Sequence, residues 1–325
     1  MRKIVLSLAS ITLLFALATS LVACGGKKDK KQKNGDGLSG NISLSGAFAL
    51  YPLAVKWAND FKQLHPDVTI DISAGGAGKG LTDALSDVVD LGMVSRELDP
   101  SELKRGAVAF AVGKDAVVPT INVKNPVLKD LFAKGVKRQT FVDLWITGNA
   151  KTWGQVAGNS SKVAVNVYTR SDACGAGDTW ADYLGKKQED LLGTGVFGDP
   201  GIASVVQNDE NGIGYNNIGY AYDSQTGKLN PGITILPIDV NENGKIDADE
   251  NFYSSRSKLA KAISEGKYPT PPARDLYLVA HGIPKNPIVK AFLKYILTKG
   301  QAANEGQGYI RIETAKADAG LKKLK

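Results

Sequence analysis

The segment YTRSDACGAGDTWADYL, residues 168–184, joins a predicted strand to a predicted helix through a loop that contains Gly175 and Gly177. The apolar alternation of residues 163–168 (VAVNVY) is typical of a strand, and the first turn of the following helix carries Asp178. This arrangement leaves unpaired backbone N–H groups at the positive end of a helix dipole. The segment therefore predicts an anion-binding site.

Arg170 lies at the end of that predicted strand. Its guanidinium has a permanent positive charge and a planar set of donors that matches the geometry of an oxyanion. An alternative interpretation is an ordinary strand-to-helix connection whose glycines only relieve backbone strain. Both interpretations stay open for this segment taken alone.

The chain has 325 residues, which favours two lobes over one small domain. Hydrophobic residues make up 43% and aromatic residues 7% of the sequence, as in globular proteins. Strands that alternate with helices predict an α/β fold.

The N-terminus has the features of an export signal. Two basic residues precede an apolar run that ends in Leu-Val-Ala-Cys, a tetrapeptide that resembles the bacterial lipobox. The resemblance implies that residues 1–23 are removed and that Cys24 is lipidated. A plain signal peptide or a membrane-spanning helix is the alternative.

Residues 24–37 are expected to form a solvated tether, because their lysines, aspartates and glycines cannot bury apolar surface. Of the formal charge of +7, the leader holds +2 and the tether a net +3, which leaves +2 for the body. A nearly neutral body argues against a nucleic-acid partner. Lysines beside a lipidated cysteine suit an anionic membrane surface.

Cys174 is the only cysteine of the predicted body, so no disulfide can form within it. A helix N-terminus at this loop would favour its thiolate. The only histidines, His65 and His281, lie in no recognisable nucleophile pattern. We therefore interpret Cys174 as a packed thiol.

Two further strand–loop–helix segments precede this one. A short strand at 41–44 and a turn at 45–48 lead into one helix, and a strand at 68–73 is followed by the glycine-rich loop 74–80. That loop lacks the Gly-Lys-Ser/Thr of a nucleotide-hydrolysing enzyme and is not a dinucleotide fingerprint. Each loop is a weak signal alone, but three in one chain favour a common function.

In order along the chain, these segments resemble those of the phosphate-binding proteins of ABC transporters. The matching motifs are Ser45-Gly46-Ala47-Phe48, the loop at 75–80, Val89 to Arg96, Arg170-Ser171-Asp172 with its glycine turn, Leu276 to Val279, Val289 to Leu297, and Gly308-Tyr309-Ile310. The resemblance implies an α/β, two-lobe type II periplasmic binding protein fold with a ligand cleft between the lobes. One lobe would comprise 38–113 plus 274–325, and the other 114–273.

The resemblance also implies roles for individual residues. Arg170 would clamp the anion and Asp172 would hold that arginine. The remaining expected ligand-binding residues are Ala47, Phe48, Ala77, Gly78, Ser95, Arg96, Gly175, Gly177 and Thr179. The chain departs from the family at two of these positions: Ala77 replaces a hydroxyl residue, and Arg96 replaces the aspartate that accepts the proton of hydrogen phosphate. Arginine there would make the cleft more positive, and Asp172 or Asp178 would have to act as the acceptor.

A second motif, DVNENGKIDADE at residues 239–250, fits the EF-hand calcium loop at every position. The predicted ligands are Asp239, Asn241, Asn243, Lys245, Asp247 and Glu250, with Lys245 at the position that supplies its backbone carbonyl. Because a strand (233–237) enters the motif, we expect an isolated EF-like loop that braces the second lobe. An ordinary Asn- and Asp-rich surface loop is the alternative.

The combined hypothesis is a lipid-anchored, monomeric solute-binding protein of the cell envelope. It would capture inorganic phosphate for the permease subunits of an ABC importer, with no cofactor except a structural Ca²⁺. One alternative is another tetrahedral oxyanion (sulfate, molybdate or tungstate). An exported phosphoester hydrolase is a further alternative, disfavoured by the scarcity of histidine. A calcium-dependent adhesion or signalling module is disfavoured by the single EF-like loop.

Overall fold

The computed structural model describes residues 37–325, and every structural statement below concerns these residues. The predicted leader, the lipidation site at Cys24 and nearly all of the tether lie outside them. Within the described part of the chain, no helix is long and apolar enough to cross a membrane.

A nine-stranded sheet runs through the body in the order β2-β1-β3-β9-β4-β7-β5-β6, with β8 paired to β4. The strands are β1 (Gly40–Gly46), β2 (Val68–Ala74), β3 (Leu91–Val94), β4 (Ala107–Asn122), β5 (Asn166–Arg170), β6 (Thr194–Val196), β7 (Gly212–Asn217), β8 (Ile233–Ile235) and β9 (Ala273–His281). The pairs β1–β2, β1–β3, β5–β6 and β5–β7 are parallel, and the pairs that involve β4 or β9 are antiparallel.

The helices follow most of the strands, as the alternating pattern predicts. They are α1 (Tyr51–Leu64), α2 (Ala77–Leu85), α3 (Pro100–Lys104), α4 (Leu128–Lys134), α5 (Arg138–Trp145), α6 (Trp153–Ala157), α7 (Gly175–Tyr183), α8 (Gly198–Asn208), α9 (Ile218–Ala221), α10 (Arg256–Ser264), α11 (Pro287–Leu297), α12 (Gln301–Gly306) and α13 (Thr314–Lys323), with a 3₁₀ turn η1 (Gln188–Asp190).

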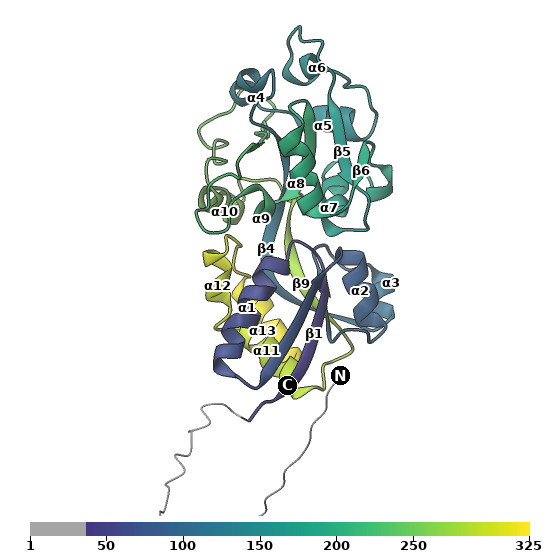
Figure 1. The fold of residues 1–325 in the computed structure, drawn as a ribbon, viewed down its shortest axis with the longest axis vertical. Helices are drawn as coiled ribbons and strands as arrows, with labels where there is room; N and C mark the ends of the chain where they lie inside the picture. The colour runs from purple at the N-terminus through teal and green to yellow at the C-terminus, as the bar shows by residue number, and fades with distance from the viewer. Residues whose placement is uncertain (1–36) are drawn as a thin grey trace, which may run out of the picture. The chain divides into compact units, whose positions relative to one another are not determined.

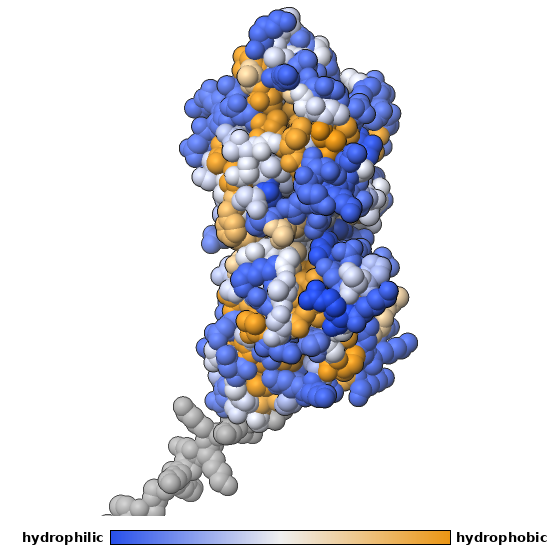
Figure 2. Space-filling view, turned by 90° about the vertical axis from the view of Figure 1, so that its right-hand side faces the viewer, coloured by the Kyte–Doolittle hydropathy of each residue, from blue (hydrophilic) through white to orange (hydrophobic). Residues whose placement is uncertain are grey.

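Two separate hydrophobic cores divide the body into two lobes. One core takes its residues from 42–112 and 276–324, and the other from 116–273. Figure 1 shows α1, α2, α11 and α13 around the first part of the sheet and α4 to α8 around the second. The face in Figure 2 is largely hydrophilic, with apolar patches scattered over both lobes.

The strands β4 and β9 connect the two lobes. They form an antiparallel ribbon from the pair Ala107–His281 to the pair Ala116–Ala273, with one register shift between Ala111 and Gly113. Beyond this ribbon, residues 117–122 of β4 pair with β7 and β8 of the second lobe. The chain therefore passes from one lobe to the other within the sheet, along β4 and β9.

The helix α2 begins earlier than its sequence suggests. The glycine-rich loop was expected to extend to Gly80, but the helix already starts at Ala77. A Cβ added to Gly80 would lie 2.6 Å from Ser45 O and 2.7 Å from Met93 O. Gly80 thus permits α2 to approach the backbone of β1 and β3, which fixes the N-terminus of α2 beside the ends of these strands.

Candidate anion-binding site

Arg170, at the end of β5, is buried and held by two carboxylates. Its Nε and Nη2 donate to Asp172 over 2.8 and 2.5 Å, and its Nη1 donates to Asp199 Oδ2 over 2.6 Å. Burial alone would lower the pKa of Arg170, but the carboxylates of Asp199 and Asp172 raise it. These three bonds leave two of the five guanidinium N–H groups for a ligand.

An aromatic side chain from the other lobe lies against this arginine. The Phe48 ring centroid is 5.5 Å from Arg170 Cζ, and the same ring makes edge contacts with Phe197 and Tyr220. Tyr220 also donates its hydroxyl to the Phe48 carbonyl over 3.2 Å. The β1–α1 loop is therefore fixed next to the guanidinium.

Loops from both lobes meet at Arg170. Gly78 N, in α2, donates to Ala173 O over 3.2 Å. A Cβ built on Gly175 would lie 2.3 Å from Ser95 O and from Ser95 Oγ, so the start of α7 lies directly against the end of β3. The N-termini of α2 and α7 thus lie near the same place, an arrangement that suits an anion.

Several backbone N–H groups at these loops have no acceptor among residues 37–325. They include those of Phe48, Ala77, Gly175 and Ala176. Unpaired N–H groups at the ends of helices are available to a negatively charged ligand. Ala176 lies in the first turn of α7, within the segment Gly175 to Thr179 that the resemblance implied as a source of donors.

Other predicted donors already have partners. The N–H groups of Ala47, Gly78 and Gly177 donate to Met93 O, Ala173 O and Cys174 Sγ respectively. The Thr179 hydroxyl accepts a bond from a second arginine, described below.

Cys174 is the N-cap of α7 and accepts the N–H of Gly177 over 3.2 Å. Burial raises the pKa of the Cys174 thiol to about 12, so the thiol is neutral near pH 7. The side chain has a structural role in closing the first turn of the helix.

Arg96, which follows β3, is also held by two carboxylates. It forms a bidentate pair with Glu102 over 2.7 and 2.9 Å, and its Nε lies 3.0 Å from Asp178 Oδ2. The hydrogen bonds to Glu102 raise the pKa of Arg96, whereas burial raises the pKa of Asp178. From the sequence, Arg96 was expected to make the cleft more positive. The carboxylates of Glu102 and Asp178 balance its charge, so that expectation was wrong.

Sequence reasoning missed Arg274 of β9, which is buried beside α7. Its Nη1 donates to Gly175 O and, over 2.9 Å, to Thr179 Oγ1. Its Nη2 donates to Asn217 Oδ1 and lies 3.7 Å from Asp115 Oδ2. Arg274 therefore positions the first turn of α7.

The buried carboxylates Asp115 and Asp199 were missed as well, and both are fully buried. Burial raises the pKa of Asp115 to about 7 although Arg274 lies nearby. Asp199 lies in the first turn of α8, after the short strand β6. That strand–loop–helix pattern was a signal for Asp199, but no comparable pattern marks Asp115 or Arg274.

A cavity of about 690 Å³ opens beside Arg96 and Arg274. Its lining includes Arg96 from one lobe, Asp178 and Thr179 from the other, and Arg274 from the connecting ribbon. Solvent can therefore reach the first turn of α7 from this side.

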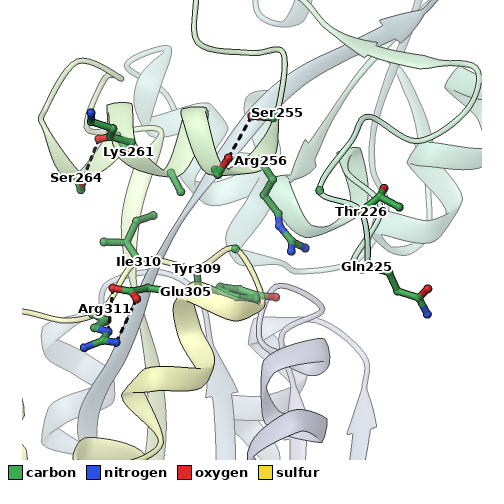
Figure 3. A pocket seen from close by; sticks show the side chains of 14 residues that line it. Gln225, Thr226, Ser255, Arg256, Lys261, Ser264, Glu305, Tyr309, Ile310 and Arg311 are labelled. Carbon is green, nitrogen blue, oxygen red and sulfur yellow. Dashed lines mark hydrogen bonds and ion pairs between the residues drawn. The ribbon is translucent and has the colours of Figure 1, made fainter.

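Another cavity, of about 500 Å³, lies away from Arg170, between α10 and the segment 305–311. Figure 3 shows Arg256 extending from the start of α10 toward Tyr309, and the ion pair between Glu305 and Arg311. Arg256 donates to Ser224 O and Gly306 O, so it links the lobes by backbone carbonyls.

Residues 31–299 match the model of the PBP superfamily domain. The phosphate-binding protein PstS of Pseudomonas aeruginosa is 29% identical, with 94% of each chain covered. PstS of Bacillus subtilis is 25% identical, with 97% of this chain and 96% of the relative covered.

Solved structures share the architecture. A candidate phosphate ABC transporter substrate-binding protein from Clostridium perfringens, solved with bound phosphate, superposes with a TM-score of 0.69 at 23% identity, covering 84% of this chain and all of that one. An ABC-type phosphate transport receptor from Vibrio cholerae gives a TM-score of 0.59 at 18% identity, with the same coverage. These likenesses show the two-lobe periplasmic binding protein fold.

Proposed function

The chain belongs to the PBP superfamily, and from this premise we propose that it is a lipid-anchored solute-binding protein that captures inorganic phosphate for an ABC importer. The relatives named as PstS and the fold neighbour with bound phosphate support the ligand class. The relatives are named as binding proteins, which supports a role without catalysis.

The observation that carries the proposal is the arrangement around Arg170. A buried guanidinium with two N–H groups left for a ligand lies where three loops bring unpaired backbone N–H groups, those of Phe48, Ala77 and Gly175 among them. Charge-assisted bonds from a fixed guanidinium are the strong contacts to an oxyanion. The backbone donors add bonds that need no reorganisation when the anion binds.

The sequence supports the proposed location. A basic and apolar leader, a lipobox-like tetrapeptide ending at Cys24 and a charged tether at 24–37 suit an anchor on the outer face of a membrane. The permease subunits of an importer are the proposed protein partner, and the protein would act as a monomer without a cofactor in its anion site.

The two cores support the lobe division predicted from the sequence. We place one lobe at 38–113 plus 274–325 and the other at 114–273, because the cores draw on 42–112 with 276–324 and on 116–273. The anion would bind where loops of the two lobes meet.

A fully ionised oxyanion such as sulfate, molybdate or tungstate is a second candidate. Phosphate near neutral pH carries a proton and needs an acceptor, yet Asp172 uses both oxygens for Arg170 and for Gly198 N. Asp178 keeps Oδ1 without a partner among the described residues. Asp178 is therefore the better-placed acceptor if phosphate is the ligand.

Titration calorimetry with phosphate, sulfate and molybdate tests the proposal. Phosphate should bind most tightly, because a matched buried donor and acceptor discriminate strongly between otherwise similar ligands. Sulfate or molybdate binding at least as tightly as phosphate would contradict the phosphate assignment and support the second candidate.

A further inference from the structure

Residues 239–250 have the complete spacing of a calcium-binding EF-hand loop. Oxygen-bearing side chains occupy positions 1, 3, 5, 9 and 12, and Gly244 occupies position 6, where φ is +85°. This position demands a sharp turn, which glycine accommodates because it has no Cβ. The spacing is independent of the anion site, which draws on none of these residues.

The first and last ligand positions are buried carboxylates without a cation. Asp239 is 1% and Glu250 is 5% exposed, and neither lies within 4 Å of a Lys, Arg or His nitrogen in the described part of the chain. Lys245, the only basic residue of the loop, pairs instead with Asp247 over 2.9 Å. Buried charges in proteins are normally paired or bound to a metal ion, and these two carboxylates form no ion pair among the described residues, so they suit a bound cation.

The side chains at positions 3, 5 and 9 converge on one point. Asn241 Nδ2 and Asn243 Nδ2 lie 3.0 and 2.7 Å from the same oxygen, Asp247 Oδ2. The nitrogen and oxygen of an amide are interchanged by a half-turn of the side chain, which would present two carbonyl oxygens beside the carboxylate. Little movement is then needed to assemble these oxygens around an ion.

The backbone of the loop is already held in a fixed form. Asp239 accepts the N–H groups of Asn243 and Gly244 over 3.1 and 2.8 Å. Glu250 Oε1 accepts those of Val240 and Asn241 over 2.9 and 3.1 Å. These bonds keep the two ends of the loop together, which brings ligand positions 1 and 12 to the same side.

The loop is attached to the second lobe at the segment between α4 and α5. Asp239 N donates to Val136 O and Ile246 N donates to Ala133 O, each over 3.1 Å. A Cβ built on Gly135 would lie 2.3 Å from Ile246 Cδ1, so the aliphatic residue at position 8 packs closely on this segment. Ordering the loop therefore also orders the connection from α4 to α5.

We propose that residues 239–250 form a structural Ca²⁺ site that stabilises the second lobe. Asp239, Asn241, Asn243, Asp247 and the backbone carbonyl of Lys245 would coordinate the ion, with Glu250 as the bidentate ligand. Within residues 37–325 no three His, Cys, Asp or Glu side chains are grouped so as to hold a metal ion by themselves. The proposed site has three carboxylates, those of Asp239, Asp247 and Glu250, and would take its other three ligands from two amides and one backbone carbonyl. Two asparagines lower the charge of the site and place its Kd at about 10⁻⁴ to 10⁻³ M, in the range of extracellular modules.

Calorimetry on the chelator-treated full chain tests this site with Ca²⁺ alone. We expect one Ca²⁺ per chain, Mg²⁺ binding at least about tenfold more weakly, and a rise in Tm of about 5 °C at a hundredfold excess of Ca²⁺ over Kd. The affinity for phosphate should be the same with and without Ca²⁺, because the anion site shares no residue with the loop. Failure of phosphate binding would leave the calcium result unaffected, and the reverse also holds.

A matched pair of variants separates coordination from general charge attraction. Glu250→Gln removes the bidentate ligand, whereas Glu242→Gln removes the same charge at a non-ligand position of the loop. We expect Glu250→Gln to weaken Ca²⁺ binding by about thirtyfold or more and Glu242→Gln by less than about threefold. Equal losses in the two variants, or no Ca²⁺ binding by the unmodified chain, would overturn the proposal.

A further variant covers the case in which Glu250→Gln does not fold, as judged by circular dichroism. Asp247→Asn changes the partly exposed ligand at position 9 and should weaken Ca²⁺ binding by about tenfold. An unchanged affinity in this variant would equally overturn the proposal.

Discussion

Arg170 and Arg96 are both held by two carboxylates, but the origin of these carboxylates differs. Asp172 and Asp199, the partners of Arg170, belong to the same lobe as Arg170 itself. Arg96 follows β3 in one lobe and pairs with Glu102 of that lobe and with Asp178 of α7 in the other. The contacts of Arg170 with its carboxylates lie within one lobe and do not depend on how the lobes are placed. The contact of Arg96 with Asp178 requires that the two lobes touch.

The difference assigns separate roles to the two arginines. Arg170 is oriented before any ligand arrives, so its donors lose little freedom on binding. The pair between Arg96 and Asp178 joins the two lobes, and its partly exposed side chains limit its strength. Arg170 should therefore determine affinity, and Arg96 should adjust the balance between open and closed forms.

The largest effect should come from Arg170→Ala. Loss of the guanidinium should weaken phosphate binding by about 2 to 5 kcal/mol, because the anion loses its fixed counter-charge. Arg170→Lys should recover only part of this loss, since an ammonium cannot replace the planar set of donors. Calorimetry measures both, with circular dichroism as the check on folding. Unmodified affinity in Arg170→Ala would remove Arg170 from the site.

The next effect is a dependence of stability on pH that comes from Asp115, which lies near a third arginine, Arg274. Burial raises the pKa of Asp115 to about 7. Unfolding returns that pKa to the ordinary value of 3.8. Between these values the native state holds the extra proton, so the contribution of Asp115 to the free energy of unfolding falls as pH rises from about 4 to 7 and is level above that.

Denaturant unfolding across this pH range measures the contribution, which amounts to at most a few kcal/mol. Asp115→Asn should flatten the profile, because it removes the titrating carboxyl and leaves the buried Arg274 and Asp199 unchanged. A profile with the same slope in Asp115→Asn would mean that other groups cause it.

A smaller effect distinguishes the two candidate proton acceptors. If Asp178 accepts the proton of phosphate, Asp178→Asn should weaken phosphate binding by about 1 to 3 kcal/mol and improve sulfate binding. Competition calorimetry with the two anions measures this selectivity. Asp172→Asn serves as the comparison, and a change in selectivity there but not in Asp178→Asn would reverse the assignment.

The smallest effect should follow Arg96→Ala. We expect phosphate affinity to fall by about 0.2 to 1 kcal/mol, because the lost pair is partly exposed and screened by salt. The loss should shrink between low and high ionic strength. A loss as large as that of Arg170→Ala would mean that Arg96 contacts the anion directly.

The sequence was informative where a site is contiguous. The loop 239–250 carries its proposed ligands within twelve residues, so spacing alone predicted them. Arg170 and Asp172 are two residues apart and belong to one motif of the family resemblance, which implied their contact. Asp199 and Arg274 reach the same place from distant segments, through the pairing of β5 with β6 and of β9 with β4. Register and packing decide such contacts, and no local pattern encodes them.

The same limit applied to charge. From the sequence, Arg96 was interpreted as an added positive charge at the cleft. Nothing in the sequence around Glu102 or Asp178 indicates that these residues pair with Arg96. Glu102 lies six residues further along the chain, in the short helix α3, and Asp178 lies in the other lobe. Both reach the Arg96 guanidinium only in the folded chain. The two-lobe fold itself was predictable, because chain length favoured two lobes and the order of motifs along nearly the whole chain resembles that of a family with this fold.

The ribbon of β4 and β9 has a mechanical consequence for such a protein. Two antiparallel strands that are hydrogen-bonded to each other resist stretching and sliding, but they allow twisting and bending. The register shift between Ala111 and Gly113 is the place where this ribbon should bend most easily. Relative motion of the lobes would then be spread over many small backbone rotations along the ribbon.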